Sequence, residues 1–242
     1  MELHSKIDVY KKFIETNPEY EGLNRYCNIC GYRFDHFANF NPVHPREAQC
    51  PVCGSLERHR HLAIHLFAIY PFLQGKRILH FAPESIIKEI LKDSGAEYFD
   101  CDINPDRATY QADITNIKIQ SDKFDPDASN VFDYIICIHV LEHIVEDVKA
   151  MSELYRVLKP GGTAFLAVPY TQTLREDYSI TDPAERDKVF GQNDHVRYYD
   201  VPTFQQRLES VGFKLTISET KKLPPVFSES LMRTDLLFIA HK

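Results

Sequence analysis

The stretch FDYIICIHVLEHIVEDVKAMSELYRVLKPGGTAFLAVP, residues 132–169, decides the fold. Its apolar run at 132–140 is typical of a buried strand, and residues 148–162 carry a helical pattern. Residues 162–169 are again rich in the apolar side chains of a strand. The stretch therefore predicts a strand–helix–strand unit.

The LKPGG sequence inside this stretch predicts how the helix ends. Pro160 cannot continue a helix, and Gly161 and Gly162 permit positive φ angles. We therefore expect the helix to stop sharply there and the chain to turn into the next strand. This is a structural motif and carries no catalytic group.

Short apolar runs alternate with helical patterns on both sides of this stretch. Because parallel strands joined by helices are covered on both faces, the alternation predicts an α/β fold with a mostly parallel sheet. The last two strand candidates are joined by a proline-containing connection that suits an antiparallel edge pair. The further predicted elements are strands at 77–81, 97–102, 214–220 and 234–242 and helices at 84–95 and 203–213.

The order of FDYIICIHVLEHI and ELYRVLKPGGTAFLAVP resembles the class I S-adenosylmethionine-dependent methyltransferases, in which an LEH segment leads to an LKPGG turn. The resemblance covers residues 76–242 and implies a Rossmann-like, seven-stranded, mostly parallel sheet with an antiparallel last strand. It also implies methyl transfer from S-adenosylmethionine. We therefore predict a methyltransferase domain at residues 75–242.

The resemblance assigns the cofactor contacts position by position. Asp102, at the end of EYFDCD, occupies the place of the acid that binds the two ribose hydroxyls. Asp113 in ADITNI matches the acid that meets the adenine amino group, with Ile114 beside the ring. Either aspartate could instead cap a turn at the end of a loop. Ile103 and His139 complete this part of the predicted cofactor site.

The glycine-rich motif of these enzymes is altered in this chain. Aligning ILHFAPESI with the usual hhDhGxGxG pattern puts His80 at the acid and Ala82 at the first glycine. Because alanine adds a methyl group and proline fixes φ, a stiffer loop is expected. We predict that Pro83 begins the following helix and that Glu84 meets the methionine ammonium group. The segment from His80 through Phe81 to Glu84 is still predicted to hold the cofactor.

Four cysteines near the N-terminus have the spacing of a zinc ribbon. Cys27 and Cys30 in CNICG, and Cys50 and Cys53 in CPVCG, form two CxxC pairs separated by nineteen residues. Each pair is followed by a glycine, which permits the tight turn that aims two thiolates at one point. Four cysteine ligands leave no open position, so we predict a structural Zn²⁺ within residues 1–55, with disulfides as the alternative.

Residues 56–74 are predicted to form a helix that links the ribbon to the methyltransferase domain and ends at Pro71. Basic side chains crowd this helix and offer either an anion site or a face that is solvated or packs on the ribbon, and we favour the second interpretation. The predicted apolar face consists of Leu56, Ala63, Phe67 and Tyr70. The basic side chains are Arg58, His59, Arg60, His61 and His65.

Histidines that follow the fourth and fifth strands are the candidate catalytic groups. Methyl transfer is an in-line displacement, so the protein aligns the acceptor with the methyl group and removes a proton from a hydroxyl or amine. His139, Glu142 and His143 would share one helix face if HVLEHI turns helical. His195 is our candidate base because it lies where these enzymes often place a substrate lid, and His143 is the second catalytic candidate. The alternative is that His195 only orders the lid.

The same side chains offer a second metal site. The pattern formed by His139, Glu142, His143 and His195 resembles the E-x-x-E-H…H metal site of small-RNA 2′-O-methyltransferases, with histidine in place of the first glutamate. In those enzymes the metal gathers the two terminal hydroxyls. In methyltransferases that need no metal, the LEH histidine packs or caps locally, so a catalytic metal is one of two alternatives.

Composition limits the partners of the chain. Its 242 residues are 43% hydrophobic and 26% charged, as in ordinary globular proteins. The net charge of −7 argues against nonspecific adhesion to nucleic acid or anionic membranes, and the apolar runs are too short to span a bilayer. We expect a cytoplasmic protein with mostly reduced cysteines.

The predicted function is methyl transfer from S-adenosylmethionine to an oxygen or nitrogen atom of a small or mid-sized polar acceptor. An RNA methyltransferase is the first alternative, since a ribosomal RNA guanine methyltransferase family also joins a four-cysteine ribbon to this fold, but residues 25–60 lack a lysine stripe. A sugar C-methyltransferase ranks below it, and a non-catalytic binding protein is the alternative from another class. Six side chains could either hold an anionic or sugar-like acceptor or simply be surface residues: Arg175, Arg186, Arg197, Tyr170, Tyr198 and Tyr199.

Overall fold

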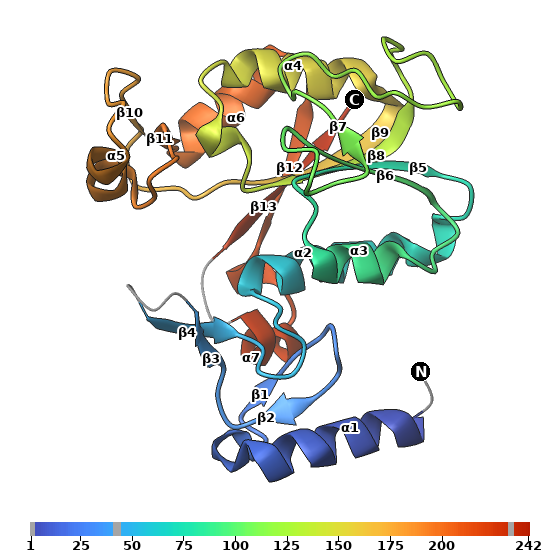
Figure 1. Ribbon diagram of the computed structural model, residues 1–242, viewed down its shortest axis with the longest axis vertical. Coiled ribbons are helices and arrows are strands. Elements are labelled where there is room, and N and C mark those ends of the chain that lie inside the picture. Colours follow the sequence, from blue (N-terminus) through green and yellow to red (C-terminus); the bar gives the residue numbers. More distant parts are fainter. Residues whose placement is uncertain (1–2, 41–44, 232–234) are drawn as a thin grey trace. The chain divides into compact units, whose positions relative to one another are not determined.

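The computed structural model describes residues 3–40, 45–231 and 235–242 (Figure 1). The chain divides into two compact units, each built from several segments. Unit 1 comprises Met1–Pro71, Ser85–Ile90 and Ser218–Leu236, and unit 2 comprises Phe72–Glu84, Leu91–Ile217 and Leu237–Lys242. Two of the unit 1 segments fall inside the range predicted for the methyltransferase domain, and the division at residues 56 and 75 stays a prediction. No helix in the described part of the chain combines the length and the apolar character needed to cross a bilayer.

Unit 2 is built on a seven-stranded sheet with the strand order β12-β13-β9-β8-β5-β6-β7. The central strands pair in parallel, whereas β13 pairs antiparallel with β9. This arrangement confirms the predicted Rossmann-like, mostly parallel sheet with an antiparallel last strand. The strands are β5 (Arg77–Phe81), β6 (Glu97–Asp102), β7 (Tyr110–Gln111), β8 (Phe132–Ile138), β9 (Leu158–Ala167), β12 (Lys214–Glu219) and β13 (Leu236–His241).

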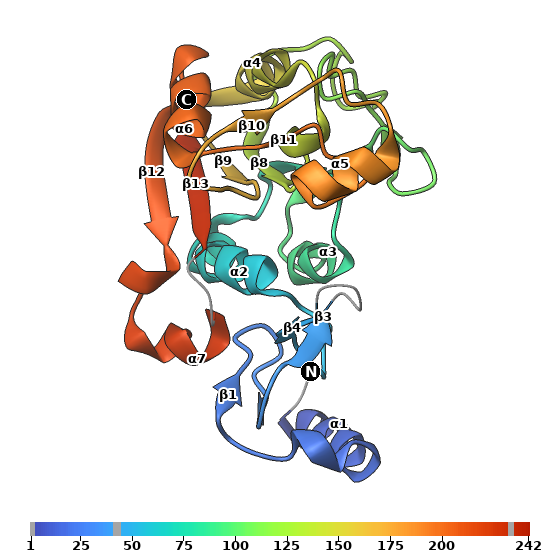
Figure 2. The same cartoon turned by 90° about the vertical axis from the view of Figure 1, so that its left-hand side faces the viewer.

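Two helices of unit 2 pack together on one side of this sheet (Figures 1 and 2). They are α4 (Asp147–Val157) and α6 (Val201–Ser210). Their apolar side chains recur at helical spacing, so each helix turns one buried stripe inward. From α6, the ring of Phe204 meets that of Phe238 on β13 edge to face, with 4.8 Å between centroids. The strand β5 is almost wholly buried, as expected for a strand covered on both faces.

The LKPGG segment differs from the prediction. Helix α4 ends at Val157, and Leu158 already has an extended backbone, so the segment forms the first part of β9. The helix therefore ends before Pro160, in agreement with the expected stop, but the segment is extended where a turn was expected. Gly161 does have a positive φ of 78°, but Gly162 does not. A side chain at Gly162 would lie 2.8 Å from the carbonyl oxygen of Lys159, so this glycine is needed for close approach of the backbone.

Other predicted boundaries shift by a few residues. The predicted strand at 234–242 is β13, and Thr234 lies outside the described residues. Helix α3 (Ser85–Leu91) ends earlier than the predicted range 84–95. The two-residue strand β7 was not predicted, because a pairing this short leaves no apolar period in the sequence.

Unit 1 contains the two cysteine pairs, each close to a small antiparallel strand pair. The ribbon core consists of Cys27, Phe34, Phe37 and Cys50, all nearly or fully buried. Its strand pairs are β1 (Arg25–Tyr26) with β2 (Arg33–Phe34), and β3 (Ala38–Phe40) with β4 (Arg46–Gln49). The helices of unit 1 are α1 (Leu3–Thr16), α2 (Glu57–Ile69), α7 (Ser228–Leu231) and all of α3 except its last residue, and short 3-10 turns lie at Pro18–Tyr20, Tyr70–Phe72, Thr220–Lys222 and Pro225–Phe227.

Helix α2 uses its basic side chains for packing, as predicted. Arg60 is fully buried and donates hydrogen bonds to the carbonyl oxygens of Ala48 and Ser230, at 3.0 and 2.6 Å. Its guanidinium group also lies 4.1 Å from the ring centroid of Phe37. The predicted apolar face is partly wrong, because Phe67 is 42% exposed. The buried apolar residues of the helix are Leu62, Ala63 and Leu66.

A buried histidine on α2 should make the stability of the protein depend on pH. His61 is 1% exposed, its Nε2 lies 2.9 Å from Ser218 Oγ, and burial, followed by the nearby His65, lowers its pKa to about 4. Because an unfolded histidine has a pKa near 6.5, the unfolded chain takes up this proton first as the pH falls. We expect His61 to lower the free energy of unfolding by about 2 kcal/mol between pH 7 and pH 5.

Urea unfolding at both pH values measures this effect. The variant His61→Gln keeps an NH donor for Ser218 but cannot titrate, so its stability should fall less between pH 7 and pH 5. An equal loss of stability in the variant and the unchanged protein would contradict the prediction.

Candidate functional site

A cavity of about 410 Å³ lies at the carboxyl ends of the parallel strands of unit 2. Phe81 at the end of β5 and Asp102 at the end of β6 contribute to its wall, as do residues 112–114 after β7 and His139 after β8. Because these strands are parallel, their carboxyl ends meet at one edge of the sheet. Open α/β sheets bind ligands at this edge, and the volume suits a small-molecule site.

Most of the predicted cofactor residues lie in the wall of this cavity. Those that line it are Phe81, Ala82, Asp102, Ile103, Asp113, Ile114 and His139. His80, Pro83 and Glu84 lie outside the lining. His80 is fully buried, with Nδ1 2.7 Å from the hydroxyl of Tyr98 and Nε2 3.3 Å from a carboxylate oxygen of Glu84. The role of each residue in binding stays a prediction.

The loop after β5 has an unusual backbone at Ala82, the position that the resemblance aligns with the first glycine of the motif. Ala82 has a φ of 47°, and its NH donates to the carbonyl oxygen of Cys101 at 2.9 Å. Such a conformation costs a non-glycine residue about 1–2 kcal/mol. Within the described residues, the non-glycine residues with positive φ are Ala82, Asn130 and His139. Two of the three line the cavity, and strain of this kind often collects at functional sites.

The helix after this loop begins later than predicted. Glu84 is the N-cap of α3 and has an extended backbone, so the first helical residue is Ser85. The prediction that Pro83 begins the helix is therefore wrong, since Pro83 precedes the N-cap. The extended backbone of Glu84 is that of an N-cap residue, which precedes the first helical residue.

The two predicted ribose and adenine carboxylates are held by local turns at the cavity wall. Asp102 Oδ1 accepts a hydrogen bond from the NH of Asn104 at 2.8 Å, and Asp113 Oδ1 accepts from the NH of Thr115 at 2.8 Å. These hydrogen bonds orient both side chains through Oδ1. They do not involve Oδ2 of either aspartate. Ile103 next to Asp102 is 64% exposed and gives the cavity a large apolar surface.

The HVLEHI segment brings three titratable groups together, but its backbone conformation differs from the predicted helix. His139 has a φ of 54°, and a short 3-10 turn follows at Leu141–His143, so the expected helix face does not form. Glu142 is nonetheless fully buried between the two histidines. Its Oε1 lies 3.2 Å from His139 Nδ1 and 3.9 Å from His143 Nε2.

Charge and burial act in opposite directions at this turn. Burial acts to raise the pKa of Glu142, but the contact with His139 and the nearby ring of His143 lower it more, so the pKa lies below its ordinary value. Glu142 is therefore ionised at neutral pH. Burial lowers the pKa of His195, so its imidazole is neutral at the same pH.

His195 lies behind His143 rather than at the cavity wall. It is 3% exposed, its Nδ1 lies 3.0 Å from the carbonyl oxygen of Phe190, and its ring meets that of His143 edge to face with 4.7 Å between centroids. His143 and Asp194 do line the cavity. The structure therefore brings both catalytic candidates together but leaves only His143 in direct reach of a bound molecule.

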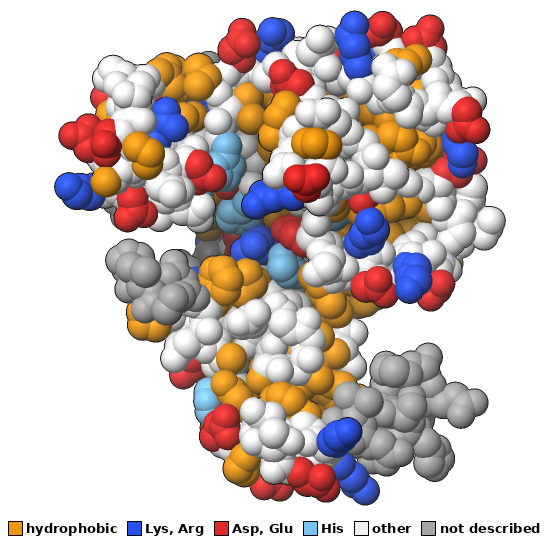
Figure 3. Space-filling view, in the orientation of Figure 1, with side chains coloured by type: hydrophobic (Ala, Val, Ile, Leu, Met, Phe, Trp, Pro, Cys, Tyr) orange, Lys and Arg blue, Asp and Glu red, His pale blue; other side chains and the backbone are white. Residues whose placement is uncertain are grey.

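The segment after β9 forms a small substructure beside these histidines. It contains β10 (Arg175–Glu176), α5 (Pro183–Phe190) and β11 (Arg197–Tyr198), with β10 and β11 paired antiparallel. Figure 3 shows histidine side chains at the surface next to this segment. Arg197 and Tyr199 are fully buried, so the expectation that these two side chains hold the acceptor is wrong.

Arg197 fixes the turn that carries Glu142, a role that the sequence did not indicate. Its guanidinium group donates to the carbonyl oxygens of Leu141, Ile144 and Val145, at 2.9 Å for Leu141 and 3.0 Å for Val145. It also donates to Glu176 at 2.7 Å. Charge patterning alone gives no signal for such a contact, because the partners are backbone oxygens more than fifty residues away.

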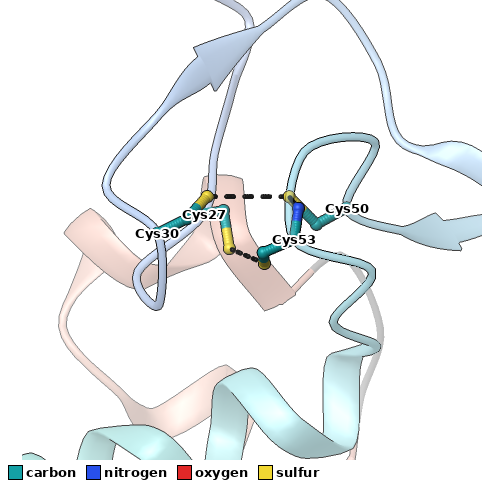
Figure 4. A group of neighbouring side chains, drawn as sticks. All are labelled: Cys27, Cys30, Cys50 and Cys53. Atoms are coloured by element: carbon teal, nitrogen blue, oxygen red, sulfur yellow. Dashed lines mark hydrogen bonds between the residues drawn. The ribbon is translucent and has the colours of Figure 1, made fainter. Parts of the chain in front are cut away.

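The four ribbon cysteines converge on one point (Figure 4). The sulfur atoms of Cys27 and Cys53 lie 3.7 Å apart, and those of Cys30 and Cys50 lie 3.8 Å apart. Four sulfurs at about 2.3 Å from a tetrahedral zinc ion would be about 3.8 Å from one another. These distances are far too long for disulfides, so the cluster fits the predicted zinc ribbon.

Solved structures similar to this chain share its fold. A SAM-dependent methyltransferase from Archaeoglobus fulgidus is 17% identical, with a TM-score of 0.52 over 78% of this chain and 95% of that one. The 1,6-didemethyltoxoflavin-N1-methyltransferase of Burkholderia thailandensis is 13% identical, with a TM-score of 0.51 over 77% and 78%. The cyclase SpnF is 12% identical, with a TM-score of 0.53 over 97% and 93%.

Sequence comparison identifies the family. No curated protein matches the sequence. A family model described as a methyltransferase domain matches residues 58–217, which include the cavity wall and the HVLEHI turn. The chain belongs to this methyltransferase family, and its fold is that of the S-adenosylmethionine-dependent methyltransferases.

Proposed function

We propose that this chain transfers a methyl group from S-adenosylmethionine to an oxygen or nitrogen atom of a small or mid-sized polar acceptor. The observation that carries the proposal is the composition of the cavity. Carboxylates of Asp102 and Asp113 line it together with His143, at the carboxyl ends of the parallel strands. The cavity thus offers a polar site for a nucleoside and a titratable group for an acceptor within one space.

The residues of the cavity wall fit the cofactor by their chemistry. A carboxylate oxygen of Asp102 can accept hydrogen bonds from ribose hydroxyls, and the exposed side chain of Ile103 offers an apolar surface to a base. When bound, the cofactor supplies an electrophilic methyl group on a sulfonium. The chain has to orient this group toward the acceptor and keep water away.

We place the activation of the acceptor at the cluster formed by Glu142, His143 and His195. His143 contacts the cavity, Glu142 supplies a buried negative charge, and His195 supports the ring of His143. A polar acceptor that reaches His143 can therefore lose its proton into this cluster. In this proposal His143 meets the acceptor, and His195 acts through it.

Cofactor binding tests the proposal most directly. In calorimetric titration, Asp102→Asn should weaken S-adenosylmethionine binding by about tenfold or more, because a hydrogen bond to a charged group contributes about 1.5–3 kcal/mol. Asp106→Asn removes the same charge from the same loop, but Asp106 lies outside the cavity lining and should bind the cofactor normally. Absence of binding at millimolar cofactor would contradict the enzyme proposal and favour a non-catalytic binding protein.

The acceptor class is tested with labelled cofactor. Incubation of the protein with methyl-labelled S-adenosylmethionine and separate pools of small molecules, RNA and protein should label the small-molecule pool. Label found only in RNA would overturn the small-acceptor proposal and favour the RNA methyltransferase.

A further inference from the structure

Glu142 is a buried carboxylate without a matching hydrogen-bond donor. The residue is fully buried, and among the described residues neither of its carboxylate oxygens has a partner with hydrogen-bond geometry. The ring nitrogen of His139 is 3.2 Å from Oε1 but lacks the alignment of a hydrogen bond. Since an ionised carboxylate loses its hydration on burial, this position favours a cation.

Two histidines present nitrogen lone pairs to the same place. The ligand atoms of Glu142, His143 and His195 all lie within 4.8 Å of one another. His195 Nδ1 lies 3.0 Å from the carbonyl oxygen of Phe190, which can only accept, so Nδ1 carries the proton and Nε2 carries the lone pair.

His143 has the same arrangement with a carboxylate as its outer partner. Its Nδ1 lies 3.4 Å from Asp194 Oδ2, which leaves Nε2 on the side of Glu142, 3.9 Å from Oε1. Histidines that bind metals commonly donate their other ring NH to a backbone carbonyl or a carboxylate, which fixes the tautomer. In this chain the Nδ1 of His195 has a carbonyl oxygen as its partner, and the Nδ1 of His143 has the carboxylate of Asp194 at ion-pair distance.

We propose that Glu142, His143 and His195 bind one divalent transition-metal ion, for which Zn²⁺ is the best-fitting candidate, separate from the ribbon cysteines. Two imidazoles and one carboxylate form the ligand set of catalytic zinc sites, whereas Mg²⁺ and Ca²⁺ prefer oxygen ligands. Three protein ligands leave a coordination position open. Because His143 lines the cavity, a molecule in the cavity can reach that position.

The metal ion restricts the acceptor atom to oxygen. This inference rests on the proposed methyl transfer. An acceptor hydroxyl bound at the open position loses its proton to water more readily, because the metal stabilises the oxyanion. The oxyanion then forms the new O–CH₃ bond as the S–CH₃ bond breaks. The sulfonium leaves as a neutral thioether, so the two charges cancel. This step refines the proposed function: the same cluster activates the acceptor through the metal ion, and His143 and His195 contribute as ligands of that ion.

Metal binding is measured without any turnover. Zn²⁺ is titrated calorimetrically into protein whose ribbon is already loaded, and one further ion is expected to bind. Glu142→Gln removes the charge of the ligand but keeps its size, and we expect the affinity for this ion to fall about a hundredfold or more. Glu146→Gln, which removes the same charge from an exposed side chain on the adjoining segment, should bind like the unchanged protein. Failure to bind a further ion, or equal affinity in Glu142→Gln, would overturn the proposal.

Activity and cofactor titration separate this proposal from the methyltransferase proposal. We expect Glu142→Gln to bind S-adenosylmethionine normally. Its rate of methyl transfer should be lower than that of the unchanged protein by a factor of about a hundred or more. An unchanged rate of methyl transfer by Glu142→Gln, or by protein shown to lack the further ion, would overturn the proposed metal site. The proposed methyltransferase activity would then still hold. If the protein binds the ion but does not bind S-adenosylmethionine, the proposed methyltransferase activity is overturned and the proposed metal site is kept.

Discussion

Loss of zinc from the four ribbon cysteines should unfold the ribbon of unit 1. Its core is small, with Cys27, Phe34, Phe37 and Cys50 as the buried members, two of which belong to the predicted zinc cluster. So few apolar side chains do not offset the entropy of ordering the chain. In zinc-finger peptides, binding of a structural zinc ion contributes about 10–16 kcal/mol to folding.

The variant Cys50→Ser tests this expectation without a chelator. It should lose the ribbon zinc, and the backbone amides of residues 25–40 and 45–54 should exchange hydrogen at the rate of an unfolded chain. Metal analysis and hydrogen exchange with mass spectrometry measure the two effects. Cys137→Ala is the matched control, because Cys137 is a buried cysteine of β8 that lies outside the cluster. Native exchange in the ribbon of Cys50→Ser would show that zinc does not hold this fold.

The parts of the fold that the sequence predicted well are those with long, regular patterns. Strand β8 and helix α4 lie within a continuous apolar and helical pattern, so their order and pairing followed from it. The cysteine spacing likewise predicted the convergence of four sulfurs, because a CxxC turn has little freedom. Strand β7 could not be predicted, since it consists of Tyr110 and Gln111 only and depends on pairing with β6.

The sequence predicted which residues belong to the candidate site but not how they are arranged. His139, Glu142 and His143 were expected on one helix face, yet the positive φ of His139 breaks the helix and places the carboxylate between the rings. Backbone strain at a non-glycine residue has no sequence signal. For the same reason Ala82 could be placed at the glycine position of the loop, but its φ of 47° could not be foreseen.

Replacement of Arg197 should have the largest effect on stability within unit 2. The fully buried guanidinium group holds the carbonyl oxygens of Leu141 and Val145 and pairs with Glu176 at 2.7 Å. Glu176 belongs to a strong network, in which the hydrogen bond from Arg207 contributes most to lowering its pKa to about 2. Leaving a buried acceptor without its donor costs about 1–3 kcal/mol, and Arg197→Met does so at the carbonyl oxygens of Leu141 and Val145, while Glu176 keeps its hydrogen bond from Arg207. We therefore expect the free energy of unfolding of Arg197→Met to fall by about 3–5 kcal/mol in urea unfolding.

Arg207→Met separates loss of the ion pairs from loss of the turn. Arg207 binds Glu176 at 2.7 Å and Asp147 at 2.6 Å, and its recorded hydrogen bonds do not reach the carbonyl oxygens of the HVLEHI turn. Its side chain is 20% exposed, so its replacement should cost less than that of Arg197. The binding of Zn²⁺ by Glu142 and the two histidines should weaken in Arg197→Met, because the turn that carries Glu142 is released, and should persist in Arg207→Met. Equal zinc affinity in both variants would show that the turn keeps its shape without Arg197, and that its position is set by the positive φ of His139 and the hydrogen bond from His139 NH to Ala167.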